Sequence, residues 1–281
     1  LKMEVIDIKK KTNLFNSKIE LSRLFDPEEI CNIIFQYPNT YGEIHIPFNY
    51  IDFGKEYNIL RTGITDLLAL TKLITPGELG LNIALGNSQR LGIPLWYGGP
   101  HPAFFATSSE LLRLIPGRII GKSTDSNGDE AYRLALQTRE QHIKKNNATS
   151  NICTSQSLLT NVVSFYSIYH GSEGLINISK KINKKTKYFL DKIKINYIYN
   201  NNFYDTVTLK IDNSIELINY LKERNIMVRK HTNNNKLISI TFDETITYDD
   251  INYLINFIRF FNCDIIKNNK NKIKNIINVY Q

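Results

Sequence analysis

Apolar and polar positions follow four different patterns along this chain. Residues 1–130 alternate short apolar runs with turn or helical segments, whereas residues 131–172 carry polar runs followed by a helical repeat. Residues 173–262 mix helical and strand periodicities, and residues 263–281 form a low-complexity tail rich in Lys and Asn. The pattern predicts a large α/β region, a connector with a long helix, a small α+β domain and a frayed or disordered tail.

The first region is predicted to hold five short strands. They lie at residues 4–8, 32–36, 58–65, 83–86 and 103–106, and a helix is expected over residues 108–114. Short buried strands separated by helical or turn segments indicate a mixed or parallel sheet. The loops at the strand ends of such a sheet are the expected place for chemistry.

The connector and the small domain are predicted from helical and alternating spacings. Apolar residues at helical spacing over 153–169 predict a helix that Gly171 ends. Beyond it we expect helices around residues 175–190, 214–224 and 251–258, and strands at residues 204–211, 226–228 and 237–242. Thr247-x-x-Asp250 resembles a capping box before the last helix.

Composition and net charge change the predicted fold class little. The sequence has 35 Lys and Arg against 27 Asp and Glu, a net charge of +8, with 42% hydrophobic and 22% charged residues. Those fractions are ordinary for a globular protein. The basic residues fall mainly in tracts of Lys, Asn and Ile without interleaved aromatic residues, which favours solvated surfaces. A basic nucleic-acid-binding protein is the alternative, and docking of an acidic protein partner is a further use of such a face.

The cysteine positions and the hydropathy of the chain argue against several classes of protein. Cys31, Cys153 and Cys263 are far apart and form no C-x-x-C pair, which argues against a disulfide framework and a zinc site. The longest stretch without charged residues, 146–172, is polar throughout, and no secretory signal is visible at Leu1. We therefore expect a protein of a reducing compartment, with no metal site and no membrane span.

The densest run of glycines lies in a loop at residues 96–101. Gly98 and Gly99 let a backbone approach a ligand closely, and His101 offers a group that titrates near neutral pH. The alternative is a tight structural loop. A phosphate-binding P-loop is excluded because no Lys occurs between Lys72 and Lys122.

Two further features hold polar side chains suited to a site. Residues 137–142 and 148–156 are rich in hydrogen-bonding groups, where Arg139 is able to clamp a carboxylate or to pair with Glu140. Asp66 stands at a predicted strand end, either as a helix N-cap or as a carboxylate directed into a cofactor pocket. Cys153 lacks neighbours that would activate its thiol.

A series of motif blocks in fixed order resembles the P protein of the glycine cleavage system. They extend almost without a gap from about Asn32 to Gly174, whereas the C-terminal unit matches only in pattern. The blocks lie at residues 35–42, 65–70, 76–80, 83–90, 97–106, 116–121, 133–143, 149–156 and 168–171.

This resemblance implies an activity, a cofactor and partners. P proteins are glycine dehydrogenases (decarboxylating) that use pyridoxal 5'-phosphate to decarboxylate glycine and pass the aminomethyl group to the lipoyl arm of the H protein. They resemble two type I aminotransferase-like halves, which are separate subunits in many organisms. This chain resembles the N-terminal half, with a large domain incomplete on its N-terminal side and a small α+β domain.

The cofactor lysine of the family belongs to the C-terminal half. In this chain Asp66 stands where a type I fold places the carboxylate for the ring nitrogen, and Gln89 and Arg90 stand near the place of the lysine. Neither an amide nor a guanidinium can form the imine. The resemblance therefore implies no catalytic residue in this chain and a heterodimer whose other half holds the cofactor.

The expected contribution of this chain is to line the shared active site or the lipoyl channel. The candidates are Gly98, Gly99, His101, Arg139, His142, Asn151 and Thr154. Trp96 departs from the family, which usually has a small Gly there. A non-catalytic scaffold or regulatory remnant is the main alternative function. The composition suits a bacterial cytoplasm, with a mitochondrial matrix as the alternative.

Overall fold

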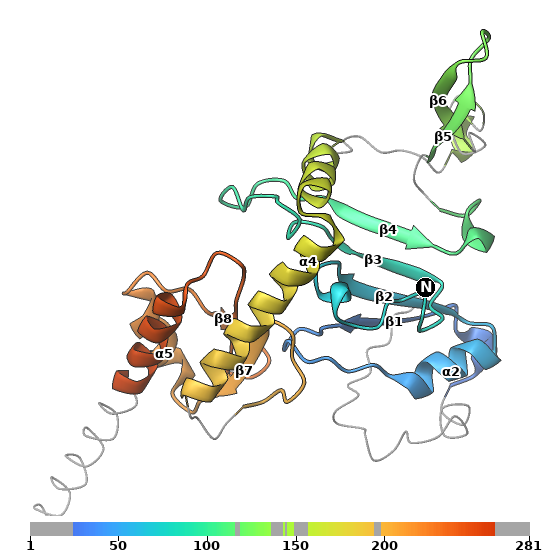
Figure 1. The fold of residues 1–281 in the computed structure, drawn as a ribbon. Coiled ribbons are helices and arrows are strands. Elements are labelled where there is room, and N and C mark those ends of the chain that lie inside the picture. Colours follow the sequence, from blue (N-terminus) through green and yellow to red (C-terminus); the bar gives the residue numbers. More distant parts are fainter. Residues whose placement is uncertain are drawn as a thin grey trace, which may run out of the picture.

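The computed structural model describes residues 25–115, 119–135, 143, 145–148, 157–193 and 198–261. Figure 1 shows a four-stranded sheet and a separate three-stranded sheet, with the long helix α4 (Ser157–Ile193) running from one toward the other. We call residues 25–115 the four-stranded unit, and residues 172–193 with 198–261 the three-stranded unit. The predicted α/β fold with a smaller α+β part is confirmed.

The four-stranded sheet has the order β1-β2-β3-β4. Its strands are β1 (Asn32–Tyr37), β2 (Leu60–Asp66), β3 (Ile83–Asn87) and β4 (Ala103–Thr107). The first three strands are parallel and β4 is antiparallel to β3, as the prediction of a mixed sheet requires. Asp66 lies opposite Asn87 in the register, so β2 and β3 end at the same edge of the sheet.

Some elements of this unit differ from the predictions. The helix expected over residues 108–114 is wrong, because only the 3-10 turn η3 (Ser109–Leu111) forms there. Conversely, α2 (Phe48–Glu56) was not predicted; it buries Ile51 and Phe53 and lies beside the sheet (Figure 1). The strand expected at residues 4–8 lies outside the described residues.

A β-hairpin stands away from both sheets in Figure 1. It pairs β5 (Ile119–Thr124) with β6 (Glu130–Ala135) in antiparallel register. Its turn is closed by Asp125, whose Oδ1 accepts hydrogen bonds from the backbone N–H groups of Asn127 and Asp129. Exposure alternates along β5, but the inner positions are only half-buried, so the sequence gives a weak strand signal.

Helix α4 consists of two segments joined at Gly171. This glycine has φ 61° and ψ −179°, a helix-ending conformation that confirms its predicted role. The second segment buries an inward face that includes Ile182, Asn183 and Phe189. The first segment buries Leu159 but leaves most of its other large apolar side chains exposed.

The three-stranded sheet has the order β7-β9-β8 and is antiparallel. Its elements are β7 (Thr206–Lys210), α5 (Ser214–Lys222), β8 (Arg229–Lys230) and β9 (Leu237–Thr241), followed by a helix over residues 248–261. The strand predicted at residues 226–228 is misplaced, because pairing begins at Arg229. The predicted capping box is confirmed, since Asp250 Oδ2 accepts from the Thr247 backbone N–H at 2.8 Å and Oγ1 at 2.6 Å.

Burial of apolar side chains is deepest in the three-stranded unit. Its core contains Phe189, Val207, Leu209, Leu217, Leu221, Ile238, Ile240, Phe242, Ile251, Ile255 and Ile258. Two smaller clusters, around Phe53 and around Tyr37, lie in the four-stranded unit. No helix within the described residues is long and apolar enough to cross a membrane.

The loop after β1 docks onto the three-stranded unit. The Ile44 backbone N–H donates to the Asn202 carbonyl oxygen at 2.9 Å, and Thr208 Oγ1 donates to the Tyr41 carbonyl oxygen at 2.7 Å. Gly42 has φ +74°, and a Cβ there would lie 2.4 Å from the Thr206 carbonyl oxygen. Only a residue without a side chain permits this approach.

Gly42→Ala is expected to destabilise the protein far more than Gly128→Ala. Both glycines have positive φ, which costs an alanine about 1 kcal/mol, but nothing lies within 4 Å of a Cβ at Gly128. At Gly42 the clash with β7 adds about 1–3 kcal/mol, giving a total loss of about 2–4 kcal/mol. Urea unfolding of both variants measures the difference, and equal losses would show that the close approach is unimportant.

Candidate functional site

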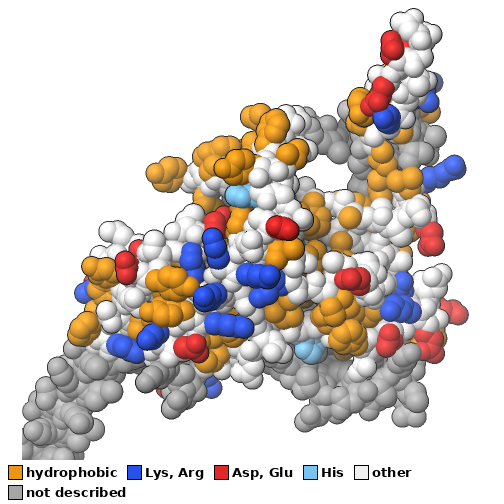
Figure 2. Space-filling model, viewed as in Figure 1, with side chains coloured by type: hydrophobic (Ala, Val, Ile, Leu, Met, Phe, Trp, Pro, Cys, Tyr) orange, Lys and Arg blue, Asp and Glu red, His pale blue; other side chains and the backbone are white. Residues whose placement is uncertain are grey.

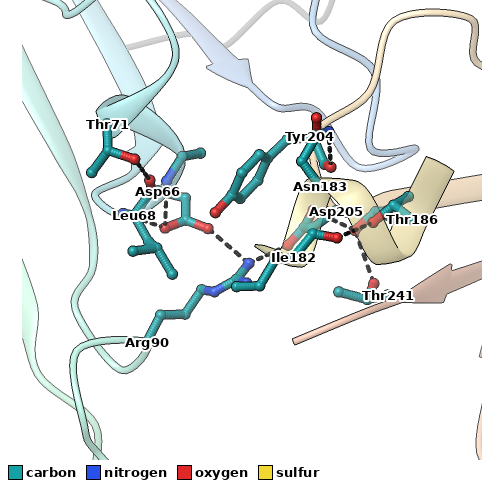
Figure 3. A network of polar contacts seen from close by, with 12 residues as sticks. Asp66, Leu68, Thr71, Arg90, Ile182, Asn183, Thr186, Tyr204, Asp205 and Thr241 are labelled. Carbon is teal, nitrogen blue, oxygen red and sulfur yellow. Dashed lines mark hydrogen bonds and ion pairs between the residues drawn. The ribbon is translucent and has the colours of Figure 1, made fainter. Parts of the chain in front are cut away.

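Three charged side chains from separate segments meet beside the end of the four-stranded sheet (Figure 3). Asp66 is the last residue of β2, Arg90 follows β3 by three residues, and Asp205 directly precedes β7. We call these residues the charge cluster. It lies where strand ends of an α/β sheet commonly carry function.

Asp66 uses both carboxylate oxygens within the chain. Its Oδ1 accepts from the backbone N–H groups of Leu68 at 2.9 Å and Ala69 at 3.5 Å, so it caps the turn that leads into η2 (Ala69–Thr71). Its Oδ2 lies 3.0 Å from Arg90 Nη1. No α-helix begins at Asp66, and the N-cap position of η2 is Leu68, so Asp66 closes a turn and is not a helix N-cap. The same carboxylate is also half of an ion pair.

A tight turn after β3 positions Arg90. The Gln89 backbone N–H donates to Asn87 Oδ1 at 2.7 Å, and the Ser88 backbone N–H donates to the Pro102 carbonyl oxygen at 2.9 Å. The Leu91 backbone N–H then closes the turn on the Ser88 carbonyl oxygen. Figure 3 shows the Arg90 side chain extending from this turn toward the two carboxylates.

Asp205 joins the cluster from the three-stranded unit. Its Oδ2 makes a short ion pair with Arg90 Nη1, and its Oδ1 accepts from Thr206 Oγ1 at 2.9 Å. The Asp205 side chain is only 8% exposed. Arg90 Cζ lies 5.6 Å from the centroid of the Tyr204 ring, and Arg90 Nη2 is buried without a hydrogen-bond partner among the described residues.

The electrostatics of the cluster follow from burial. Burial raises the pKa of Asp66, and the nearby charge of Asp205 adds to that rise while Arg90 opposes it. Burial by itself would lower the pKa of Arg90, but the two carboxylates raise it above its usual value. Burial also raises the pKa of Tyr204 to about 12. The guanidinium is therefore fixed as a cation between two acids.

The glycine loop is placed apart from this cluster. The backbone N–H groups of Gly98 and Gly99 donate to the Leu95 carbonyl oxygen at 3.0 and 3.2 Å. His101 is exposed, with Nδ1 3.5 Å from the Gly99 carbonyl oxygen. Within the described residues, no hydrogen bond or ion pair joins this loop to the charge cluster. Arg139, His142, Asn151 and Thr154 lie outside the described residues.

Trp96 lies close to Gly99. Trp96 has φ +42°, and a Cβ at Gly99 would lie 2.8 Å from the Trp96 Cβ. The absence of a side chain at Gly99 thus leaves room for the Cβ of Trp96. The Trp96 side chain is half exposed and the next residue, Tyr97, is fully exposed.

Sequence reasoning missed the residues that the three-stranded unit supplies. Beside Asp205 and Tyr204, Asn183 accepts from Lys72 Nζ at 2.8 Å and donates to the Tyr204 carbonyl oxygen at 2.6 Å. The partners lie 111 and 21 residues from Asn183 along the chain. A polar Asn on the apolar face of a predicted helix was the available signal.

A second feature is a patch of exposed apolar side chains, which we call the apolar surface. It comprises Leu95, the adjoining Trp96 and Tyr97 of the glycine loop, and Leu158, Phe165, Ile168 and Tyr169 of α4. The segment before the glycine loop contacts the helix, because a Cβ at Gly92 would lie 2.6 Å from the Tyr166 ring. Figure 2 shows apolar side chains gathered over the first segment of α4 and the adjoining loop.

Comparison with known proteins confirms the resemblance that the motif blocks predict. The family model described as "Glycine cleavage system P-protein" matches residues 2–258. Glycine dehydrogenase (decarboxylating) of Pelagibacter ubique is 46% identical over 247 residues, 86% of this chain and 25% of that protein. The mitochondrial glycine dehydrogenase (decarboxylating) of Mus musculus is 42% identical over 234 residues, 82% of this chain and 23% of that protein.

Solved structures agree with these matches. A glycine decarboxylase (P-protein) in inhibitor-bound form has a TM-score of 0.76 and 26% identity, covering 82% of this chain and 55% of that chain. An alanine–glyoxylate aminotransferase from Nostoc sp., at 14% identity and a TM-score of 0.56, shares the fold alone, covering 85% of this chain and 63% of that chain. The fold is thus that of type I pyridoxal-phosphate enzymes.

This chain spans about a quarter of the length of those curated relatives. The family model nevertheless matches most of its residues, with the glycine loop and the residues of the charge cluster inside the match. The chain therefore belongs to the glycine cleavage system P-protein family.

Proposed function

We propose that this chain is the N-terminal part of a glycine dehydrogenase (decarboxylating), without the lysine that binds the cofactor. It acts together with the C-terminal, lysine-bearing half of such an enzyme, which we call the lysine-bearing half. The assembled enzyme decarboxylates glycine with pyridoxal 5'-phosphate and passes the aminomethyl group to the lipoylated H protein. Family membership and the partial coverage of the relatives support this assignment.

The state of Asp66 is the observation that carries the proposal. A self-contained site needs an amine to hold the cofactor aldehyde and a free carboxylate for the ring nitrogen. Here both oxygens of Asp66 are engaged, by the backbone of the following turn and by Arg90. Arg90 also stands near the expected place of the lysine and cannot form an imine. The residues of this site do not fit the cofactor, so its retention falls to the lysine-bearing half.

Lys72 is the lysine that follows Asp66 most closely along the chain. Its Nζ donates to Asn183 Oδ1 at 2.8 Å, a contact with α4. Burial lowers the pKa of Lys72, and the charges of Lys187 and Lys180 add to the effect. This amine therefore contacts the three-stranded unit through Asn183.

The apolar surface is the proposed contact face for the lysine-bearing half. Phe165, Ile168 and Tyr169 are 70%, 77% and 86% exposed, and contiguous exposed apolar patches mark interaction sites. The glycine loop contributes to the same surface. A partner bound there would also cover Gly98, Gly99 and His101, as expected for residues that line a shared site.

The remaining expectations extend this proposal. Arg139, His142, Asn151 and Thr154 are proposed to line the same shared site or the lipoyl channel. Bacterial and mitochondrial relatives both occur, and we propose a bacterial cytoplasm on the basis of the composition. The alternative, a non-catalytic scaffold, would use the same apolar surface for binding. It differs only in that the assembled complex would not turn over glycine.

The purified chain is expected to bind no pyridoxal phosphate covalently. Incubated with the cofactor and then borohydride, it should yield no specific pyridoxyl-labelled lysine by peptide mapping, because Arg90 replaces the amine. Co-expressed with the remaining segments of a related glycine dehydrogenase, it should form a complex that exchanges bicarbonate with the carboxyl group of glycine.

Two results would contradict this expectation. Stoichiometric labelling of one lysine of the isolated chain would contradict the proposal of a half without a cofactor lysine. A stable, cofactor-loaded complex without exchange activity would favour the scaffold alternative. The remaining segments expressed without this chain serve as the control for activity.

Phe165→Asp and Tyr169→Asp are expected to weaken binding of the lysine-bearing half. A charge placed in a desolvated aromatic contact should raise Kd at least about tenfold for each variant. Calorimetric titration measures the change. The matched control is Tyr253→Asp, which alters an aromatic side chain that is 65% exposed on the helix over residues 248–261. Equal effects at all three positions would locate the contact elsewhere.

A further inference from the structure

We infer that Arg90 is a positioning residue that latches the three-stranded unit onto the four-stranded unit. The two carboxylates that it joins come from the two units, Asp66 from β2 and Asp205 from the residue before β7. This role goes beyond the proposed function and does not depend on it.

A single nitrogen of Arg90 connects the two carboxylates. Arg90 Nη1 meets Oδ2 of Asp66 and Oδ2 of Asp205 at the same time. Charge-assisted contacts of this kind are stronger than neutral hydrogen bonds. Removal of this single group would sever both ion pairs, and no other ion pair between the two units is found among the described residues.

Both ends of the latch are anchored within their own units. On one side, Asp66 Oδ1 is held by the backbone N–H groups of Leu68 and Ala69. On the other side, Asp205 Oδ1 accepts from Thr206 Oγ1, which also contacts Thr241 Oγ1 of β9 at 2.9 Å. A shift of either carboxylate would disturb the hydrogen bonds that hold it within its own unit. The bridge through Arg90 therefore fixes the relative position of the two units.

Further groups of the three-stranded unit lie within reach of the Arg90 charge. The Tyr204 ring lies beside the guanidinium. The pKa of Asp243 is lowered in spite of burial, by hydrogen bonds with Thr245 and Ile246 and also by Arg90. If the guanidinium were removed, Asp66 and Asp205 would face each other as buried like charges and repel.

Distances between spin labels on the two units test the latch. The labels sit on Cys31, which is exposed before β1, and on Glu216→Cys, an exposed position of α5, in the full chain with Cys153→Ser and Cys263→Ser. In Arg90→Gln we expect the distance distribution to broaden and to gain a population absent from the parent. Lys122→Gln, which removes an ion pair of the separate hairpin, should leave the distribution unchanged.

A charge-rescue variant distinguishes the loss of charge pairing from the loss of side-chain packing. Arg90→Gln combined with Asp205→Asn removes the repulsion, so its distribution should return toward that of the parent, between the parent and Arg90→Gln. Loss of side-chain packing alone would leave the double variant as broad as the single one.

Two results would overturn the latch if Arg90→Gln folds. One is a parent-like distance distribution in Arg90→Gln, and the other is a double variant whose distance distribution is no narrower than that of Arg90→Gln. If Arg90→Gln yields no folded protein, the double variant must still fold and show a broadened distribution. Failure of the double variant to fold, or a parent-like distribution in it, then overturns the latch.

Discussion

Two carboxylates that are mostly removed from water need a cation, and Arg90 is the cation that this fold supplies. An ionised carboxylate in a protein interior is strongly disfavoured unless it is paired and hydrogen-bonded. Asp66 and Asp205 each use one oxygen for local hydrogen bonding and the other for Arg90. The contact between the two units depends on this arrangement, because it turns a repulsive pair into an attractive bridge.

Neutral groups also contribute to the contact between the units. Gly42 lets the loop after β1 approach the Thr206 backbone, and Thr208 donates to the Tyr41 carbonyl oxygen. The Tyr41 ring stacks on His231 with centroids 4.9 Å apart. Burial, with a contribution from Arg229, lowers the pKa of His231 and so keeps this ring neutral near pH 7. Close backbone approach and stacking provide shape, whereas Arg90 provides the charge balance.

Local signals in the sequence were sufficient for most strands and for the helix ends. Gly171 and the Thr247–Asp250 capping box depend on neighbouring residues, and both predictions are confirmed. The β5–β6 hairpin was missed because its inner positions are only half-buried, so its alternation is weak. The helix α2 was missed because it is short and contains Gly54, a poor helix former.

The charge cluster required information that no local pattern holds. Asp66 was identified as a strand-end carboxylate, and Arg90 was noted only as a residue unable to form an imine. Asp205 lies 115 residues from Arg90, and the packing of one unit on the other brings them together. Such a pairing has no periodicity, spacing or capping signal, so a single sequence could not reveal it.

The identity of residue 90 links the chemistry of the chain to its architecture. A lysine has one compact ammonium, which can be deprotonated and used as a nucleophile. An arginine has a planar guanidinium that stays charged and can donate to two carboxylates at once. Arg90, which cannot form an imine, therefore satisfies Asp66 and Asp205 and holds the two units together. Under the proposed function, a fixed arrangement of the two units gives the lysine-bearing half a rigid surface to bind.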